Sequence, residues 1–491
     1  MKELDKLLEA VKKYNDEEVE RIIEAYNFAK EAHKDQKRES GEPYIIHPIN
    51  VCINLAKFHA DGATLIAGML HDVVEDTKYA IEDINDKFGN EVGKLVLGVT
   101  KINNIHYSSL NEARDANIRR IITSLNEDVR IIIIKLCDRL HNMRTLKYKA
   151  PNKQQRSAIE TLNIYVPLAY FIGAYRLKCE LEDICLSYLK PDIYKELNNR
   201  ILYIRKDYLV CIDKTEKKIA EILLKNNIKF DIRTRILNVY NIYKKIKQGY
   251  KINEIHDLVN LKIIIEKEMD CYKVLGLVHK CFPPMNSKFK DYIAAPKTNM
   301  YRSLHTTVFG PDEHIIQIQI KTKEMDNINT YGIASYWYKY KAEGAKKMQE
   351  ELLHNYQFIS TIDNLNNSIK KDKLFLEKIK SEIFSNNVYV YTAKGDIVEL
   401  PSGSTPIDFA YKIHTEIGNH LAKCIINGHE VSFNYKLKNK DRIIIITNEK
   451  SKPNKRWINI VKTTIAKKRI KEFYSKKSNW NILFFLIMFD H

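Results

Sequence analysis

Residues 65–76 read LIAGMLHDVVED, and this stretch decides the fold expected for the first part of the chain. An apolar run leads into His71 and Asp72, and Glu75 and Asp76 each follow one helical turn later. Polar groups that share one face of an otherwise apolar helix are costly to bury unless a cation or a hydrogen-bond partner compensates them. The stretch therefore predicts a helix that carries part of a metal site.

Two more segments offer ligands for the same ion. His47 lies in GEPYIIHP (41–48), and Asp138 lies in KLCDRLHNMRT (135–145). With His71 and Asp72 they form a set of nitrogen and oxygen donors without a thiolate, which suits Mn²⁺ better than structural zinc. An isolated His-Asp pair is weak evidence, and the case depends on the three spaced segments together.

Hydrophobic periodicity divides the chain into segments of different structural class. Helical spacing runs to about residue 195, strand-like runs such as LVNLKIIIE (258–266) then alternate with helical stretches, and short β-like runs with one helix come later. In chain order we expect an all-α domain (1–195), an α/β domain (196–340), a lysine-rich helical connector (341–386), a small β-grasp domain (387–448) and a basic helical tail (449–491).

Composition limits the cellular setting and the partners. The 491 residues have room for roughly three domains. The net charge of +18 favours polyanions such as nucleotides, RNA or ribosomes, although an AT-rich genome also raises the lysine content and gives the same excess. Eight cysteines without a CxxC pair and a charged N-terminus without a signal sequence indicate a cytoplasmic protein. The apolar run 480–489 is too short to span a bilayer, so we expect no membrane association.

The segments 38–48 (RESGEPYIIHP), 71–76 (HDVVED) and 135–145, in this order, resemble the HD hydrolase domain of RelA/SpoT homologues. That domain removes the 3′-pyrophosphate of the alarmone (p)ppGpp in the stringent response. The resemblance implies Mn²⁺ ligands at His47, His71, Asp72 and Asp138, catalytic roles for Glu75 and Asp76, and nucleotide contacts from Arg38 and Asn142. Glu39 departs from the family, which usually has lysine there, and the loss of this positive charge implies weaker substrate binding.

Residues from about 230 to 340 resemble the synthetase domain of the same family, which transfers pyrophosphate from ATP to GDP or GTP. The clearest match is KFKDYIAAPKTNMYRSLHTTVFG (288–310). The resemblance implies phosphate contacts at Arg235 and Lys245, a Mg²⁺ ligand at Asp257, guanine stacking on Tyr301, and a retained His305.

Several positions of this synthetase-like site have changed. Gln317, in IIQIQIKTKEM (315–325), stands where the family has a glutamate, and a neutral amide cannot act as a base. Four further departures are Leu237 for lysine, Lys262 and Lys321 for arginine, and Met300 for glycine. We therefore expect pyrophosphate synthesis to be lost or much reduced, so that Mg²⁺ matters only if this site is active. Two alternatives are that the family's glutamate corresponds to a residue next to Gln317, or that another carboxylate such as Glu324 substitutes for it. The domain also retains the means to bind guanine nucleotide.

The stretch 388–431 resembles a TGS domain, again in the order of a long RelA/SpoT homologue. In the family this module contacts tRNA on the ribosome or an acyl carrier protein. His414 matches the position linked to the tRNA end, although a lone histidine is more often structural.

The interpretation is thus a multidomain cytoplasmic enzyme that converts (p)ppGpp to GDP or GTP and pyrophosphate, with an inactive synthetase domain. Two rival interpretations remain. One is a bifunctional enzyme that also transfers pyrophosphate from ATP to GDP or GTP. The other is a non-catalytic regulator that binds the ribosome or tRNA.

Overall fold

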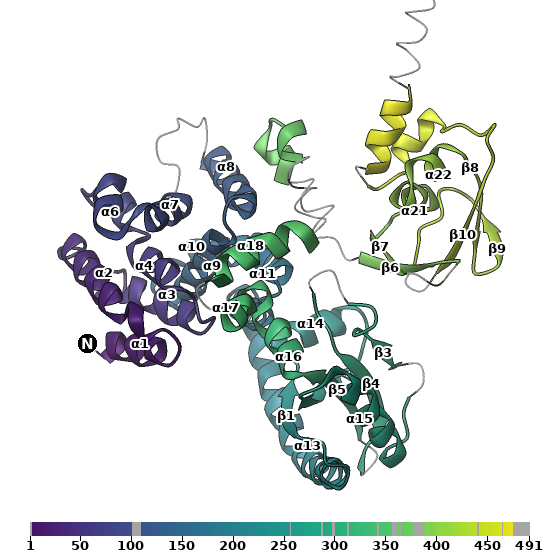
Figure 1. Ribbon diagram of the computed structural model, residues 1–491, viewed down its shortest axis with the longest axis horizontal. Helices are drawn as coiled ribbons and strands as arrows, with labels where there is room; N and C mark the ends of the chain where they lie inside the picture. Colours follow the sequence, from purple (N-terminus) through teal and green to yellow (C-terminus); the bar gives the residue numbers. More distant parts are fainter. Residues whose placement is uncertain are drawn as a thin grey trace, which may run out of the picture. The chain divides into compact units, whose positions relative to one another are not determined.

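The computed structural model divides into two compact units, Met1–Asp363 and Asn364–His491 (Figure 1). The boundary between them falls inside the connector expected at 341–386. The apolar run 480–489 lies outside the described residues. Described are residues 2–100, 110–255, 257–285, 288–296, 300–311, 314–340, 343–355, 362, 365–376, 387–393, 395, 397–438, 441–463 and 465–474.

The first unit begins with a bundle of helices (Figure 1). Its elements are α1 (Lys2–Lys12), α2 (Val19–Ala32), α3 (Ile46–Ala56), α4 (Gly62–Leu70), α5 (Val73–Asp76), α6 (Ile81–Phe88), α7 (Asn90–Val99), α8 (Leu110–Thr123), α9 (Val129–Arg144), α10 (Pro151–Glu160), a π-helical turn (Thr161–Tyr165), α11 (Val166–Phe171) and α12 (Tyr175–Leu189). The bundle agrees with the all-α domain expected from the periodicity.

Helix α4 lies at the centre of this bundle. Its residues are buried on every side, which explains its continuous apolar sequence. The side chain of Asp61 caps its N-terminus by accepting a hydrogen bond from the amide of Thr64 at 2.8 Å. Gly68 lets α3 approach closely, because a Cβ there would lie only 2.5 Å from Cδ1 of Leu55. Since α3 also packs against α9, the consecutive helices α3 and α4 meet a helix from far along the chain here.

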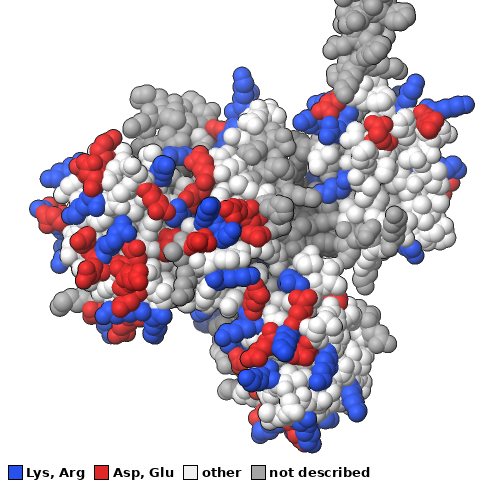
Figure 2. Space-filling model, in the orientation of Figure 1, with Lys and Arg blue, Asp and Glu red and all other residues white. Residues whose placement is uncertain are grey.

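Charged side chains of both signs cover the first unit. On the face in Figure 2, Lys and Arg are interspersed with Asp and Glu over the N-terminal helices. On this face, therefore, the described basic side chains of the unit are not gathered into one patch.

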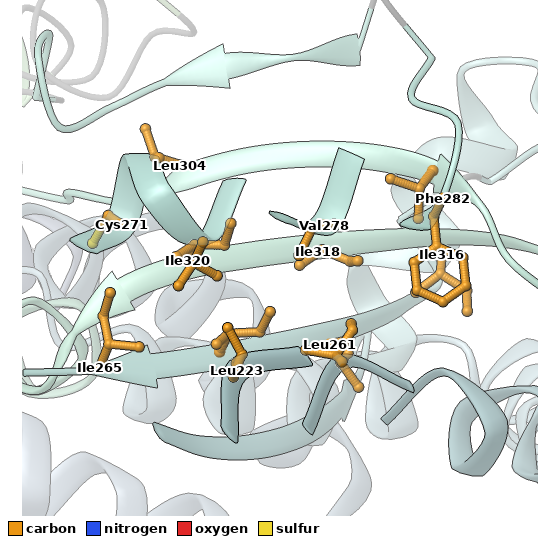
Figure 3. Close-up of a cluster of buried hydrophobic side chains, with 14 of the residues drawn as sticks. Leu223, Leu261, Ile265, Cys271, Val278, Phe282, Leu304, Ile316, Ile318 and Ile320 are labelled. Atoms are coloured by element: carbon orange, nitrogen blue, oxygen red, sulfur yellow. The ribbon is translucent and has the colours of Figure 1, made fainter. Parts of the chain in front are cut away.

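An α/β domain completes the first unit. Its elements are α13 (Pro191–Lys225), β1 (Phe230–Ile236), α14 (Val239–Lys247), β2 (Val259–Ile265), α15 (Glu268–Cys281), β3 (Lys290–Asp291), β4 (Leu304–Phe309), β5 (Ile315–Thr322) and α16 (Lys323–Tyr331). The sheet order is β1-β2-β5-β4-β3, with β2 and β5 parallel and the other pairs antiparallel. Helices α13 and α15 pack against the sheet through side chains such as Leu223, Val278 and Ile318 (Figure 3).

The chain then returns to the helical bundle through α17 (Ser335–Tyr340) and α18 (Gly344–Asn355). Trp337 Nε1 donates to Asp61 Oδ2 at 3.0 Å, and the Tyr338 hydroxyl donates to the carbonyl of Lys57 at 3.2 Å. In α18, Gln349 Oε1 accepts from the amide of Val129 at 2.9 Å, where α9 begins. These contacts tie the α/β domain to the bundle.

The second unit contains a β-grasp sheet with the order β7-β6-β10-β8-β9 (Figure 1). Its elements are β6 (Asn387–Thr392), β7 (Ile397–Pro401), α21 (Pro406–Ile413), α22 (Thr415–Asn419), β8 (Leu421–Ile426), β9 (His429–Val431) and β10 (Arg442–Thr447). The expected combination of all-α, α/β and β-grasp domains is confirmed.

The described part of the basic tail packs on this β-grasp domain. Trp457, Val461 and Ile470 are buried against apolar residues of α21 and β8. The carboxylate of Asp408 accepts hydrogen bonds from the amides of Lys462 and Thr463 at 2.7 to 3.0 Å. Among the described helices, none is both long and apolar enough to cross a bilayer.

Candidate metal centre

The stretch 65–76 is interrupted where its polar residues lie, which differs from the single helix expected. Helix α4 ends at Leu70 and α5 begins at Val73, with His71 and Asp72 between them. Both residues keep backbone angles close to helical ones, with φ of −60° and −99°. The break brings two neighbouring side chains to one point, since His71 Nε2 lies 3.2 Å from Asp72 Oδ2.

His47 from α3 and Asp138 from α9 reach the same point. His47 Nε2 lies 3.3 Å from His71 Nε2 and 3.3 Å from Asp138 Oδ1. It lies 3.6 Å from Asp72 Oδ2, and His71 Nε2 lies 3.9 Å from Asp138 Oδ1. The structure thus brings together the two imidazoles and two carboxylates that the sequence singled out.

The donor set fits a small divalent cation. Ligand atoms about 2.1 Å from a shared ion lie roughly 3.0 to 3.4 Å apart at octahedral or tetrahedral angles. Most of the distances above are close to that range. His71 Nδ1 lies 2.8 Å from the carbonyl oxygen of Gly68 and donates to it, which leaves Nε2 as the free lone pair. His47, His71 and Asp138 also satisfy the geometry of a three-ligand metal cluster.

The electrostatics of the cluster also favour a cation. Burial alone would raise the pKa of Asp72, but His71, His47 and the Tyr44 hydroxyl hold it well below its usual range. Burial is likewise outweighed at Asp138, where His47, Lys135 and His71 lower the pKa. Two ionised carboxylates thus lie beside two buried imidazoles, where a cation can pair with them.

The pKa values of the two imidazoles are shifted in opposite directions. Burial lowers the pKa of His47. Burial opposes protonation of His71 as well, but the carboxylates of Asp72 and Asp138 raise its pKa. Two nitrogens 3.3 Å apart cannot both carry a proton that points at the other, so at most one proton lies between them. A metal ion would replace that proton.

The two acidic residues that follow lie beside the cluster. Asp76 is exposed, and its Oδ2 lies 3.1 Å from the Tyr44 hydroxyl, which also donates to Asp72 Oδ2 at 2.6 Å. Glu75 is half-buried on α5. Asp76 is therefore connected to a ligand through one phenol.

The expected nucleotide contacts are connected to another ligand. Arg38 Nη2 donates to Asn142 Oδ1 at 3.0 Å, and Asn142 Nδ2 donates to Asp138 Oδ1 at 2.6 Å. Arg38 also lies over the Tyr44 ring, 5.6 Å from its centroid. Glu39 is exposed beside them. Arg38 is thus held beside the cluster by Asn142 and Tyr44, and its planar guanidinium is suited to contact a phosphate.

Sequence reasoning missed two residues that touch the ligands. Tyr44 bonds to Asp72, and His141 Nδ1 lies 2.7 Å from His47 Nδ1. Burial lowers the pKa of His141 to about 3, aided by the nearby His47 and Arg38. Both residues lie within the segments quoted for the ligands, so their closeness in sequence to His47 and Asp138 was the available signal.

The synthetase-like residues lie on the sheet strands and on the segments that flank them. Lys245 Nζ pairs with Asp257 Oδ1 at 2.8 Å, and the Tyr301 hydroxyl lies 2.7 Å from His305 Nε2. Arg235 on β1 lies over the ring of Tyr175, 4.5 Å from its centroid.

Gln317 on β5 lies opposite Asn260 of β2 and Thr307 of β4. Its Oε1 accepts a weak hydrogen bond from Gln319 at 3.4 Å. Leu237 is partly buried, packed with a small apolar cluster beside α14. An amide and an aliphatic side chain thus occupy these two positions, and neither is a base.

The lysines of this site surround one carboxylate. Lys262 and Lys321 lie 3.7 and 3.5 Å from Asp326 Oδ1. Burial, then Lys262, lowers the pKa of Lys321 to about 7. Met300 has a φ of +62°, the left-handed region that suits the glycine it replaces.

In the second unit, His414 is exposed and caps α22. Its Nδ1 accepts a hydrogen bond from the amide of Glu416 at 3.3 Å. This contact gives His414 a structural role in the fold.

Three family models match successive parts of the chain. They are an HD domain over residues 25–174, a region found in RelA/SpoT proteins over 234–345, and a TGS domain over 388–447.

Curated relatives match nearly the whole chain. The guanosine-3′,5′-bis(diphosphate) 3′-pyrophosphohydrolase of Aquifex aeolicus is 41% identical over 477 residues, covering 96% of this chain and 67% of the relative. The enzyme of that name from Borreliella burgdorferi is 40% identical over 470 residues, with 95% and 70% covered. A GTP pyrophosphokinase of Myxococcus xanthus is 39% identical over 466 residues, with 94% and 61% covered. The chain thus spans roughly two thirds of the length of these relatives.

Proposed function

The chain belongs to the RelA/SpoT family, and from this premise we propose that it is a Mn²⁺-dependent (p)ppGpp 3′-pyrophosphohydrolase. The products are GDP or GTP and pyrophosphate. The observation that carries the proposal is the convergence of His47, His71, Asp72 and Asp138, in which the Nε2 atom of each imidazole lies 3.2 to 3.9 Å from the donor atoms of the other three residues.

The reaction requires one water molecule and two proton movements. A bond forms from the water oxygen to the first phosphorus of the 3′-pyrophosphate, and the bond from that phosphorus to the ribose 3′-oxygen breaks. The water loses a proton, and the ribose oxygen gains one. When bound, a divalent cation lowers the pKa of a coordinated water and offsets charge on the phosphate.

We assign the proton movements to Glu75 and Asp76. The phenol of Tyr44 bridges Asp76 to Asp72 and so keeps the Asp76 carboxylate next to the ligands. Neighbouring carboxylates are suited to accept a proton from water at neutral pH and to return it to the leaving oxygen. Arg38, fixed by Asn142, supports the nucleotide through its planar guanidinium.

The direct test supplies purified chain with ppGpp and Mn²⁺ and follows GDP and pyrophosphate by anion-exchange chromatography. We expect hydrolysis that EDTA stops and that His71→Ala or Asp72→Ala abolishes. Asp86→Ala, which removes an exposed carboxylate on α6, is the matched control and should behave like the wild type. Hydrolysis that persists in EDTA, or in either ligand variant, would contradict the proposal. A chain that releases no pyrophosphate would favour a non-catalytic ribosome- or tRNA-binding regulator.

We further propose that the synthetase-like site transfers no pyrophosphate, because Gln317 supplies no base and Leu237 no charge. Retention of Tyr301, His305, Arg235, Lys245 and Asp257 favours the second candidate, a bifunctional enzyme.

One incubation separates the two candidates. The His71→Ala/Asp72→Ala double variant, which cannot destroy its product, is given ATP, GDP and Mg²⁺. We expect no ppGpp, and its accumulation would establish the bifunctional enzyme.

The remaining proposals concern setting and partners. We propose a cytoplasmic location, with (p)ppGpp and GDP or GTP as nucleotide partners. For the TGS domain we propose contact with tRNA on the ribosome or with an acyl carrier protein. Pull-down of ribosomes and of acyl carrier protein by the full chain, compared with a His414→Ala variant, tests the domain directly.

A further inference from the structure

A second imidazole lies directly behind the ligand His47. His141 occupies the last turn of α9, three residues after Asp138, and its Nδ1 lies 2.7 Å from His47 Nδ1. Both side chains are buried, with 1% of His47 and 8% of His141 exposed. The Nε2 atom of His47 faces the opposite way, toward His71 and Asp138. His141 therefore contacts His47 on the side of the ring opposite to the one that faces His71 and Asp138.

The short contact fixes where the protons must lie. His47 binds a cation through Nε2 only if that nitrogen carries no proton, so its ring proton is on Nδ1. The Nδ1–H group then donates to His141 Nδ1, which must itself be unprotonated. A neutral His141 carries its own proton on Nε2.

The two ligand histidines are held in this tautomer by different means. His71 donates from Nδ1 to the carbonyl of Gly68 at 2.8 Å, a main-chain acceptor that a substitution does not remove. His47 depends on the side chain of His141 for the equivalent acceptor. Partners of this kind orient a ligand ring and raise its basicity toward the metal.

We propose that His141 is a positioning residue that holds His47 in the tautomer able to bind the divalent cation. The inference rests on the proposed function, because it assumes that the cluster takes a cation. Loss of the acceptor should weaken cation binding while leaving the chemical step intact.

The test is Mn²⁺ binding to the full chain, followed by the electron paramagnetic resonance signal of the free ion. His141→Leu fills similar space without an acceptor, and we expect affinity to fall about 10- to 100-fold. His141→Asn places an amide oxygen near the former Nδ1 position and should recover most of that loss. Met143→Ala is the control for loosened packing, since it opens space in the same buried turn and should leave affinity unchanged.

A second readout separates positioning from a general structural effect. The rate of ppGpp hydrolysis by His141→Leu should approach the wild-type rate at saturating Mn²⁺, with the half-saturating concentration raised. The inference is overturned if His141→Leu binds Mn²⁺ like the wild type, if His141→Asn is as weak as His141→Leu, or if Met143→Ala loses as much. A wild-type chain that binds no Mn²⁺ would instead overturn the proposed function itself.

Discussion

Replacement of Tyr44 by phenylalanine isolates one polar contact of the candidate metal centre. The hydroxyl of Tyr44 lies 2.6 Å from Asp72 Oδ2 and 3.1 Å from Asp76 Oδ2. Tyr44→Phe removes this donor but keeps the ring, which stacks on His33 with centroids 4.6 Å apart. The change therefore tests the hydrogen bond rather than the packing.

The expected cost follows from the burial of the acceptor. The Asp72 side chain is only 17% exposed, so water replaces the lost donor poorly. A hydrogen bond to a charged group contributes about 1.5 to 3 kcal/mol, and the two carboxylates also repel each other more strongly without the shared proton. In the metal-free protein, we expect Tyr44→Phe to lower the free energy of local unfolding of this region by about 2 kcal/mol.

Hydrogen exchange of the amides from α3 to α5 in EDTA measures that free energy locally, without assuming that both units unfold together. Tyr14→Phe is the matched control, because its hydroxyl donates to a neutral acceptor, the carbonyl of Ala60, at 3.2 Å. Its cost should be about 1 kcal/mol or less. In an Asp72→Asn background the effect of Tyr44→Phe should shrink, since the charged acceptor is gone. The reasoning is refuted if Tyr44→Phe costs no more than Tyr14→Phe, or costs the same in both backgrounds.

Three more outcomes are expected. Folding lowers the pKa values of Asp72 and Asp138. Their contribution to stability is therefore complete above the unfolded pKa of about 3.9 and is lost as the pH falls below it. The urea midpoint measured in EDTA should drop between about pH 4 and pH 3, and it should drop less in Asp138→Asn. Met300→Gly should raise stability by about 1 kcal/mol because it relieves the left-handed backbone, and an unchanged urea midpoint would contradict this. Asp408→Asn should increase hydrogen exchange of residues 455–463 at least tenfold, since a buried carboxylate there accepts several hydrogen bonds, and unchanged protection would argue against that anchoring role.

The ligand set of the metal centre was accessible from the sequence, whereas its local geometry was not. His47, His71, Asp72 and Asp138 stand in short segments whose composition is unusual for apolar helices. The break between α4 and α5 cannot be predicted from the hydrophobic periodicity of the sequence, because His71 and Asp72 keep near-helical backbone angles. The His47–His141 contact joins residues 94 positions apart, and spacing along the chain says nothing about such a distance.

In the basic tail, the structure differs from the prediction in which residues are buried. Its excess of lysine and arginine predicts only a basic helical tail, but Trp457, Val461 and Ile470 are buried on the β-grasp domain. Charge counted over a whole segment hides a few apolar residues that face inward. The anchor, Asp408, lies in a different segment and accepts main-chain hydrogen bonds that no side-chain pattern reveals.

The synthetase-like site keeps its fold around an amide at position 317, on which the proposal that it transfers no pyrophosphate rests. Gln317 is paired in the middle of the sheet, opposite Asn260 and Thr307, and its amide oxygen accepts from Gln319 at 3.4 Å. An amide has nearly the same shape as the carboxylate found in the family and keeps an acceptor oxygen there, so the sheet tolerates it. It has no proton affinity at neutral pH, however, so Gln317 itself cannot serve as a base.

The metal centre offers no such neutral substitution. There, each ionised carboxylate is stabilised by an imidazole, and each imidazole by a carboxylate, at 3.2 to 3.9 Å. Removing one charge leaves its buried partners uncompensated, which costs stability as well as metal affinity. Loss of any one of these charges therefore carries a folding cost, whereas the sheet accommodates the amide of Gln317. That difference in local electrostatics distinguishes the candidate metal centre from the synthetase-like site of the same unit.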